Sequence, residues 1–249
     1  MRPAFNCGTG DWLRAGMALL GAVLFLALAF PPGAQAQEGI NQKLAAGEII
    51  VSSHSVPGSN VQKAKMIAIV KAPPEVVWQV ITDINHFKEF MPQTRTSMVI
   101  AADKIPLLLQ KTPTSAQEVE KILGPIPAKL PRQPGGKYTV YHYSDLHLPW
   151  PCSDRWYVLK GTMDETRAAQ HIYRSSWSLL FGNLKENSGE WLLEPYDAHQ
   201  TKLTYRLSTD PGGSIPGFLV KRGTCVTLPQ VIEAIRKRTA NLSQVKSSS

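Results

Sequence analysis

Polar side chains that could bind or transform a ligand gather between residues 141 and 157. Arg155 carries a planar fork of donors that fits a carboxylate or a phosphate group. Its alternative role is a structural ion pair with Asp154 or another nearby carboxylate, because an arginine inside a domain must be paired. Both roles are open from the sequence. The polar candidates of this stretch are Arg155, Tyr157, His142, Tyr141 and Tyr143.

The sequence lacks recognisable catalytic and metal-binding motifs. It contains no nucleophile elbow, no C-x-x-C pair and no His/Cys spacing typical of a metal site. His142 and His147 would face opposite sides of a strand, so they cannot act as a pair. Glu190 and Glu194 share a face, but it is the face predicted to be wet. We therefore expect no metal and no cofactor, and a binding protein in preference to an enzyme.

One strand and two short helices are predicted between Lys65 and Pro92. Apolar residues alternate from Met66 to Ala72, which indicates a strand. Pro73-Pro74 ends this strand, and a proline suits the first turn of a helix because its missing N–H is not needed there. The helix that follows has one apolar stripe, formed by Val77, Val80, Ile81 and Ile84. This pattern predicts a helical wedge after the second strand.

A run of strands at regular spacing follows from Lys137 and indicates an antiparallel sheet. In the last two strands, apolar residues alternate with charged or polar ones, so one face should be covered and the other wet. The predicted strands are Glu48–Ser55, one from about Val61, Thr94–Ala101, Tyr138–Leu148, Arg155–Asp164, Gln170–Leu180, Gly189–Pro195 and Lys202–Asp210.

A helical pattern runs from the Asp210-Pro211-Gly212-Gly213 corner to about Leu242, and Pro229 should kink or split it. The stretch 103–136, with six prolines, reads as irregular apart from one helix at Ser115–Leu123. A curved antiparallel sheet gripped by the C-terminal helix is the simplest assembly of these parts. The expected fold class is therefore α+β.

The N-terminus has the layout of a secretory signal peptide. Arg2 and Arg14 flank an apolar run, Met17–Phe30, and Ala34-Gln35-Ala36 resembles a cleavage site. The rival interpretation is an uncleaved anchor, but the run has 14 residues, fewer than the roughly 20 that a spanning helix needs. We expect cleavage after Ala36 and a periplasmic or secreted protein. The expected divisions are residues 1–36 as signal peptide, 37–45 as flexible lead-in, 46–242 as one domain and 243–249 as disordered tail.

The chain carries a formal net charge of +8, but the positive charge is spread out. Its only tight cluster is Arg236-Lys237-Arg238, which is either a solvated helix face or a loose contact for anionic lipid headgroups. Nucleic acid is not an expected partner, because no motif for its recognition is present. We expect a monomer.

Two cysteines, Cys152 and Cys225, would remain after cleavage. An oxidising compartment permits a disulfide between them. The sequence does not show whether their Cα atoms come close enough for a disulfide. The alternative is a pair of buried free thiols.

Five segments resemble the START-like superfamily, which includes StAR-related lipid-transfer domains and polyketide cyclases. They are GEIIVSSHSVPGS, APPEVVWQVITDINHFKEFMP, LPWPCSDRWYV, GEWLLEPYDAHQTKLTYRLSTDPGGSIPGFLVKR and LPQVIEAIRKR. The resemblance spans nearly all of residues 46 to 241 and is greatest to exported bacterial members. Trp156 departs from it, since many relatives carry an acidic residue there. The resemblance implies the helix-grip fold.

It also implies a cavity that binds a lipid or another hydrophobic small molecule, with the C-terminal helix as a lid. Sterols, phospholipids, fatty acids, hopanoids and quinones all fit such a space. The alternative is a cavity enzyme of the cyclase or hydrolase type, acting on an aromatic or polycyclic ligand; a third option is a partner-binding module whose cavity is filled. The residues expected to contact the ligand are Arg155, Tyr157, Trp177, Trp191, Tyr205, Leu207, Phe218, Leu219, Val231 and Ile235.

Overall fold

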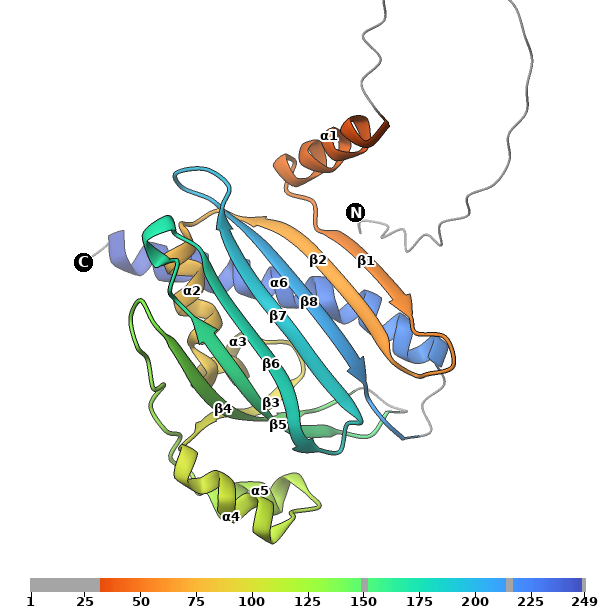
Figure 1. Ribbon diagram of the computed structural model, residues 1–249, viewed down its shortest axis with the longest axis vertical. Coiled ribbons are helices and arrows are strands. Elements are labelled where there is room, and N and C mark those ends of the chain that lie inside the picture. Colours follow the sequence, from red (N-terminus) through yellow and green to blue (C-terminus); the bar gives the residue numbers. More distant parts are fainter. Residues whose placement is uncertain (1–31, 149–151, 214–216, 248–249) are drawn as a thin grey trace, which may run out of the picture.

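The computed structural model describes residues 32–148, 152–213 and 217–247 (Figure 1). The predicted signal peptide lies almost wholly outside the described residues. The helices are α1 (Pro32–Ala45), α2 (Pro74–Thr82), α3 (Phe87–Phe90), α4 (Ile105–Lys111), α5 (Ala116–Leu123) and α6 (Gly217–Ser247), with short 3-10 turns at Ile84–His86, Ala102–Lys104 and Ala168–Gln170. The strands are β1 (Ile50–Ser55), β2 (Gln62–Val70), β3 (Thr94–Ile100), β4 (Lys137–Leu146), β5 (Arg155–Asp164), β6 (Tyr173–Gly182), β7 (Glu186–Pro195) and β8 (Thr201–Asp210).

The eight strands form one antiparallel sheet in the order β1-β2-β8-β7-β6-β5-β4-β3. The sheet curves, and α6 crosses one of its faces behind β1, β2 and β8 (Figure 1). Helices α2 and α3 lie on the same side as α6. This arrangement confirms the predicted α+β helix-grip fold, including the helical wedge after the second strand.

The wedge folds as its apolar pattern predicts. In β2, Met66 and Ala68 are fully buried, and in α2 the same holds for Val77 and Val80. Pro74 occupies the first turn of α2, where its missing N–H breaks no hydrogen bond. Together these residues form one core between the sheet and the helices.

The outer face of the central strands is polar, as the alternation predicts. Glu190 of β7 forms ion pairs with Arg174 of β6 and Arg206 of β8, and Lys202 lies 3.3 Å from Glu194. These cross-strand pairs keep the outer face charged and leave the concave face to the apolar residues.

The outer face is nevertheless not bare along its whole width, which corrects the expectation of a sheet covered on one side. Helices α4 and α5 lie against the β3–β5 end (Figure 1), and a second apolar core forms there around Leu108, Val119 and Trp156. The prediction missed α4, but α5 matches it, and the hydroxyl oxygen of Ser115 caps α5 by accepting the N–H of Glu118. The proline-rich stretch thus covers β3–β5.

The structure is helical at both ends of the domain, where the sequence led us to expect a flexible lead-in and a disordered tail. Residues 37–45 continue α1, whose Leu44 is buried and which contacts β1 and β2. Pro229 does not split the C-terminal helix, because burial of Leu228 and Ile232 on either side outweighs one lost hydrogen bond. The helix runs on to Ser247, through most of the expected tail. Within the described ranges, no helix is long and apolar enough to span a membrane.

Candidate ligand-binding cavity

A cavity of about 720 Å³ lies between the concave face of the sheet, the wedge and α6. This volume is within the range of pockets that hold small molecules. Its walls are mostly apolar and come from α2, α3 and the turn between them, from strands β4 to β8, and from the part of α6 around Val231. A curved sheet cannot touch a straight helix along its whole length, and the remaining space is this cavity.

Seven of the ten residues predicted to contact the ligand line the cavity: Arg155, Tyr157, Trp177, Trp191, Tyr205, Leu207 and Val231. Ile235 lies one turn beyond Val231 and is fully buried in the main core, so it does not belong to the cavity wall. Phe218 and Leu219 fall in α6, where their side chains are outside the described part of the chain. The role of the seven residues as ligand contacts stays a prediction.

Sequence reasoning missed several wall residues. The wedge contributes Ile81, Ile84, Phe87 and Met91, which the apolar stripe marks as inward-facing but not as cavity-facing. Ser144 and Asn187 also line the cavity. Ser144 shares the face of His142 on β4, so strand parity could have found it.

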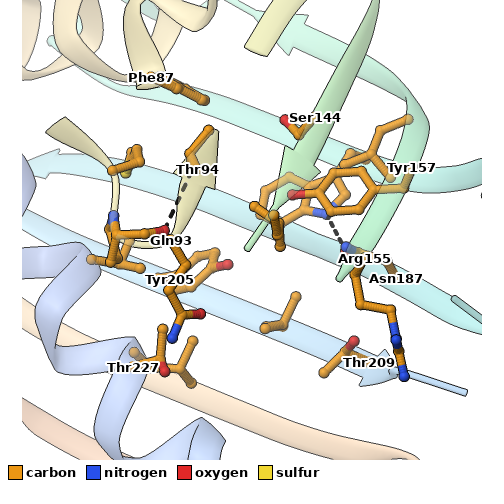
Figure 2. Close-up of a pocket in the computed structure, with 18 of the residues that line it drawn as sticks. Phe87, Gln93, Thr94, Ser144, Arg155, Tyr157, Asn187, Tyr205, Thr209 and Thr227 are labelled. Atoms are coloured by element: carbon orange, nitrogen blue, oxygen red, sulfur yellow. Dashed lines mark hydrogen bonds between the residues drawn. The ribbon is translucent and has the colours of Figure 1, made fainter. Parts of the chain in front are cut away.

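Three aromatic rings form one wall. Trp191 stacks on Tyr205 with ring centres 3.8 Å apart, and Trp177 lies 5.8 Å from Tyr205. The indole Nε1–H of Trp177 donates to Oδ1 of Asn187 at 3.0 Å, which fixes the ring (Figure 2). Gly189 lies opposite Trp177 across the β6–β7 pair. A β-carbon at this position would collide with the Trp177 ring, so the glycine makes room for it.

Arg155 is buried, with 5% of its surface exposed. Its Nε–H donates to the carbonyl oxygen of Pro211 at 2.6 Å, and its Nη2 donates to that of Gly212 at 3.2 Å. Its Nη1 donates to the carbonyl oxygens of Ser153 and Asp154 and to the Ser153 hydroxyl. The side chain extends away from Tyr157 in Figure 2. Arg155 therefore ties the start of β5 to the corner before α6.

Within the described part of the chain, Arg155 forms no ion pair with Asp154 or with another carboxylate. The carboxylate of Asp154 instead accepts hydrogen bonds from Arg95 at 2.6 Å and from the backbone N–H of Leu148 at 3.2 Å. The bond from Arg95 holds the pKa of Asp154 below its ordinary value. His147 also contacts Asp154, on the exposed side, whereas His142 lines the cavity. The two histidines thus lie on different faces, as predicted.

A small group of polar side chains interrupts the apolar lining. His142 and Tyr157 lie edge to face with ring centres 6.3 Å apart, and Ser144 is the cross-strand partner of Tyr157. Burial lowers the pKa of His142 to about 4, so its imidazole is neutral at ordinary pH. Burial raises the pKa of Tyr157 and of Tyr205, so both phenols keep their protons. These groups offer neutral hydrogen bonds.

Tyr141 and Tyr143 do not belong to the site, which corrects their place among the polar candidates. Tyr143 is fully buried in the outer core, where its hydroxyl donates to the Glu120 carboxylate at 3.1 Å. Tyr141 packs against the same core. Trp156 lies there too, edge-on to Phe181. The tryptophan at position 156, which departs from the family pattern, therefore packs in the core beneath α4 and α5.

Cys152 lines the cavity. The possible disulfide with Cys225 stays a prediction, because the structure describes the side chain of Cys152 alone. Cys225 lies on α6, in the stretch whose side chains are not described. The structure brings Cys152 into the cavity wall, where a ligand would contact it.

The basic cluster of α6 is largely occupied by internal contacts. Arg236 donates to the carbonyl oxygen of Ile69 and to Glu233, and Arg238 pairs with Asp83 and Glu89. Lys237 is exposed. The two arginines thus fasten α6 to β2 and to the wedge. Among the described residues, no cluster of His, Cys, Asp or Glu could hold a metal ion.

Comparison with known proteins gives a consistent family. Residues 70–236 match the family described as polyketide cyclase / dehydrase and lipid transport. A STAR-related lipid transfer protein from Xanthomonas axonopodis has a similar fold, with 23% identity and a TM-score of 0.56 over 77% of this chain and 93% of that one. Human STARD10 is similar at 14% identity and a TM-score of 0.56, over 91% of this chain and 87% of that one.

An uncharacterized protein of Pseudomonas aeruginosa shares 32% identity over 98 residues, which is 36% of this chain. The chain spans about half, 48%, of the length of that relative. The two solved structures support the fold alone.

Proposed function

We propose that this chain, which belongs to the polyketide cyclase / dehydrase and lipid transport family, binds a lipid or another hydrophobic small molecule in its cavity and transfers it. The observation that carries the proposal is the cavity itself. It is large enough for a small molecule, mostly apolar, and lies beneath α6, for which we propose the role of a lid. Contact between water and the apolar cavity wall is unfavourable, so an apolar ligand that displaces this water binds favourably.

We propose that the protein acts in the periplasm or outside the cell, and that the signal peptide directs its export. We further propose a monomer that meets a membrane surface transiently and binds no nucleic acid. Val226 of α6 is exposed and lines the cavity, so the mouth offers apolar surface for such contact. Arg236 and Arg238 of α6 are engaged in internal contacts, so the proposed membrane contact does not rest on them.

Catalysis in the same cavity is the alternative. His142 and Tyr157 could move a proton, but none of the described cavity-lining residues carries a carboxylate that would support them. The neutral imidazole favours hydrogen bonding to a ligand. The geometry thus supports binding better than a cyclase-type reaction.

Filling the cavity tests the proposal. Leu159 lines the cavity and is buried, whereas its neighbour Lys160 is exposed on the outer face. The variant Leu159→Trp should abolish transfer of fluorescent lipid between donor and acceptor vesicles, and Lys160→Trp should not. Both variants should keep the circular dichroism spectrum of the parent. Equal transfer by the two variants would show that the cavity does not carry the lipid.

A further inference from the structure

We infer that the cavity selects an uncharged ligand with one oxygen function, a hydroxyl or a carbonyl, which hydrogen-bonds to His142, Tyr157 and Tyr205. The inference rests on the proposed function and goes further by naming the ligand class. Ionised lipids, such as fatty acids and phospholipids, would be disfavoured. The argument follows from the charges that face the cavity and from the polar groups that lack partners there.

Charge is nearly absent from the cavity wall. Of the described residues that line it, only Arg155 carries a full charge at neutral pH. No lysine and no carboxylate is among them. A buried anion without an opposite charge or several hydrogen bonds is strongly disfavoured. An anionic ligand would therefore depend on Arg155 alone.

Arg155 is already engaged in hydrogen bonds and is poorly placed to bind an anionic ligand. The carbonyl oxygens of Pro211, Gly212, Ser153 and Asp154 engage all three of its nitrogen atoms. A ligand carboxylate or phosphate could form the two parallel bonds that arginine favours only by replacing some of these contacts, and would thereby leave buried carbonyl groups without donors. The contacts that hold the corner before α6 thus remove Arg155 as a binding site for anions.

Polar groups without partners line the same cavity. Tyr205 is 9% exposed, and its contacts with Trp177 and Trp191 are made by the ring. Within the described part of the chain, neither the Tyr205 hydroxyl nor a ring nitrogen of His142 forms a hydrogen bond. Both groups line the cavity, so a matching ligand group can become the hydrogen-bond partner that the protein does not supply.

These groups surround one part of the cavity. Ser144 and Tyr157 are cross-strand partners on β4 and β5, and His142 is on the same face two residues before Ser144. Tyr205 comes from β8, and Figure 2 shows Ser144, Tyr157 and Tyr205 arranged around the same space. A neutral imidazole offers one donor and one acceptor, and a phenol offers both. A hydroxyl or carbonyl oxygen placed among them would be satisfied without any charge.

Matched ligand pairs test the inference. The pairs are a sterol with its sulfate ester, and a long-chain alcohol with its alkyl sulfate, because a sulfate stays ionised at every accessible pH. Binding is measured at neutral pH by the change in tryptophan fluorescence and checked by native mass spectrometry. We expect the neutral member of at least one pair to bind about tenfold more tightly than its sulfate, or better, because the buried anion lacks a counter-charge.

A Tyr→Phe exchange isolates the hydrogen bond. Tyr205→Phe keeps the aromatic stack but removes the hydroxyl, so it should weaken binding of the neutral oxygen compound about tenfold. Binding of the parent hydrocarbon, which has no oxygen, should not change. Tyr143→Phe is the matched control, since that hydroxyl lies on the outer face and donates to Glu120. It should leave both affinities unchanged.

The experiments distinguish failure of this inference from failure of the proposed function. A sulfate that binds as tightly as its neutral partner would overturn the selection of uncharged ligands and leave the proposed function standing. A Tyr205→Phe variant with unchanged affinity would overturn the role of this hydroxyl. If no member of either pair binds, the inference falls together with the proposed function.

Discussion

The Nε–H of Arg155 donates to the carbonyl oxygen of Pro211 across 2.6 Å, between the first residue of β5 and the corner that precedes α6. This bond joins the cavity wall to the chain segment that precedes α6. The same guanidinium binds Gly212, whose own N–H donates to Oδ1 of Asp210. The corner is thus held from both sides, and its position depends on one buried side chain.

Replacing Arg155 should loosen this corner. Arg155→Gln should lower the free energy of unfolding by about 2 kcal/mol or more, because hydrogen bonds from a charged group are lost in a buried place. Amide hydrogen exchange should also speed up at residues 210–213. Urea denaturation and exchange mass spectrometry measure the two effects. Arg167, which is exposed, gives the control Arg167→Gln. Similar unfolding free energies and similar exchange rates in the two variants would contradict this role of Arg155.

Acid should destabilise the fold through His142. Burial lowers its pKa to about 4, against about 6.5 in an unfolded chain. Between these values the unfolded state binds the extra proton, so the free energy of unfolding should fall as the pH falls from about 6.5 to about 4. The loss should reach at most about 3 kcal/mol. In His142→Gln this part of the pH dependence should vanish, as urea denaturation at several pH values would reveal. An unchanged pH profile would argue against a buried neutral imidazole.

Glu165 should be essential for the attachment of the wedge. Its buried carboxylate accepts hydrogen bonds from Trp78 and Tyr138, each at 2.9 Å, and from Arg132. Burial raises its pKa, but the bonds from Arg132, Trp78 and Tyr138 outweigh burial and hold the pKa below its ordinary value. Its contribution to stability is therefore present above the ordinary pKa and is lost as the pH falls through the lowered one.

The variant Glu165→Gln should cost about 3 kcal/mol in unfolding free energy, because it breaks a buried charged network. Glu194→Gln, which affects only an exposed pair with Lys202, should cost less than about 1 kcal/mol. Chemical denaturation compares the two variants. Equal costs would mean that the Glu165 network does not hold the wedge.

Gly189 should control the aromatic wall. Gly189→Ala places a methyl group against both the Trp177 ring and the backbone oxygen of Arg206, so the indole and the β7–β8 pair must shift and the bond of the indole to Asn187 is disturbed. We expect an altered tryptophan emission spectrum and ligand binding that is weaker by about tenfold or more. Gly136→Ala is the control, because its β-carbon would meet only ordinary contacts with Gln133. Normal binding by Gly189→Ala would show that this wall is not needed.

Local patterns predicted much of the fold. β5 has the predicted bounds, Arg155–Asp164, because turn residues flank a run rich in apolar and aromatic side chains there. The stripe of α2 is buried as expected. By contrast, α4 was missed because Pro106 suggests irregular structure, although a proline in the first turn is compatible with a helix. The apolar outer face of β3–β5 was missed because the helix that helps to cover it, α4, was missed.

The site was only partly predictable. Strand parity placed Trp191 and Tyr205 correctly, since alternation fixes the face of each side chain. It does not distinguish a cavity wall from a filled core, and Ile235 therefore lies in the core. The bonds of Arg155 to Pro211 and Gly212 were not predictable, because these are backbone carbonyls of a corner 56 and 57 residues away in the sequence. Such contacts leave no pattern in residue types.

Native mass spectrometry of the protein, after exposure to a bacterial lipid extract, tests the central claim most directly. The bound fraction is released with organic solvent and identified. The account predicts one small, uncharged hydrophobic molecule per chain, present in the parent and in Lys160→Trp and absent from Leu159→Trp. A protein that emerges empty, or that carries the same molecule in both variants, would contradict it.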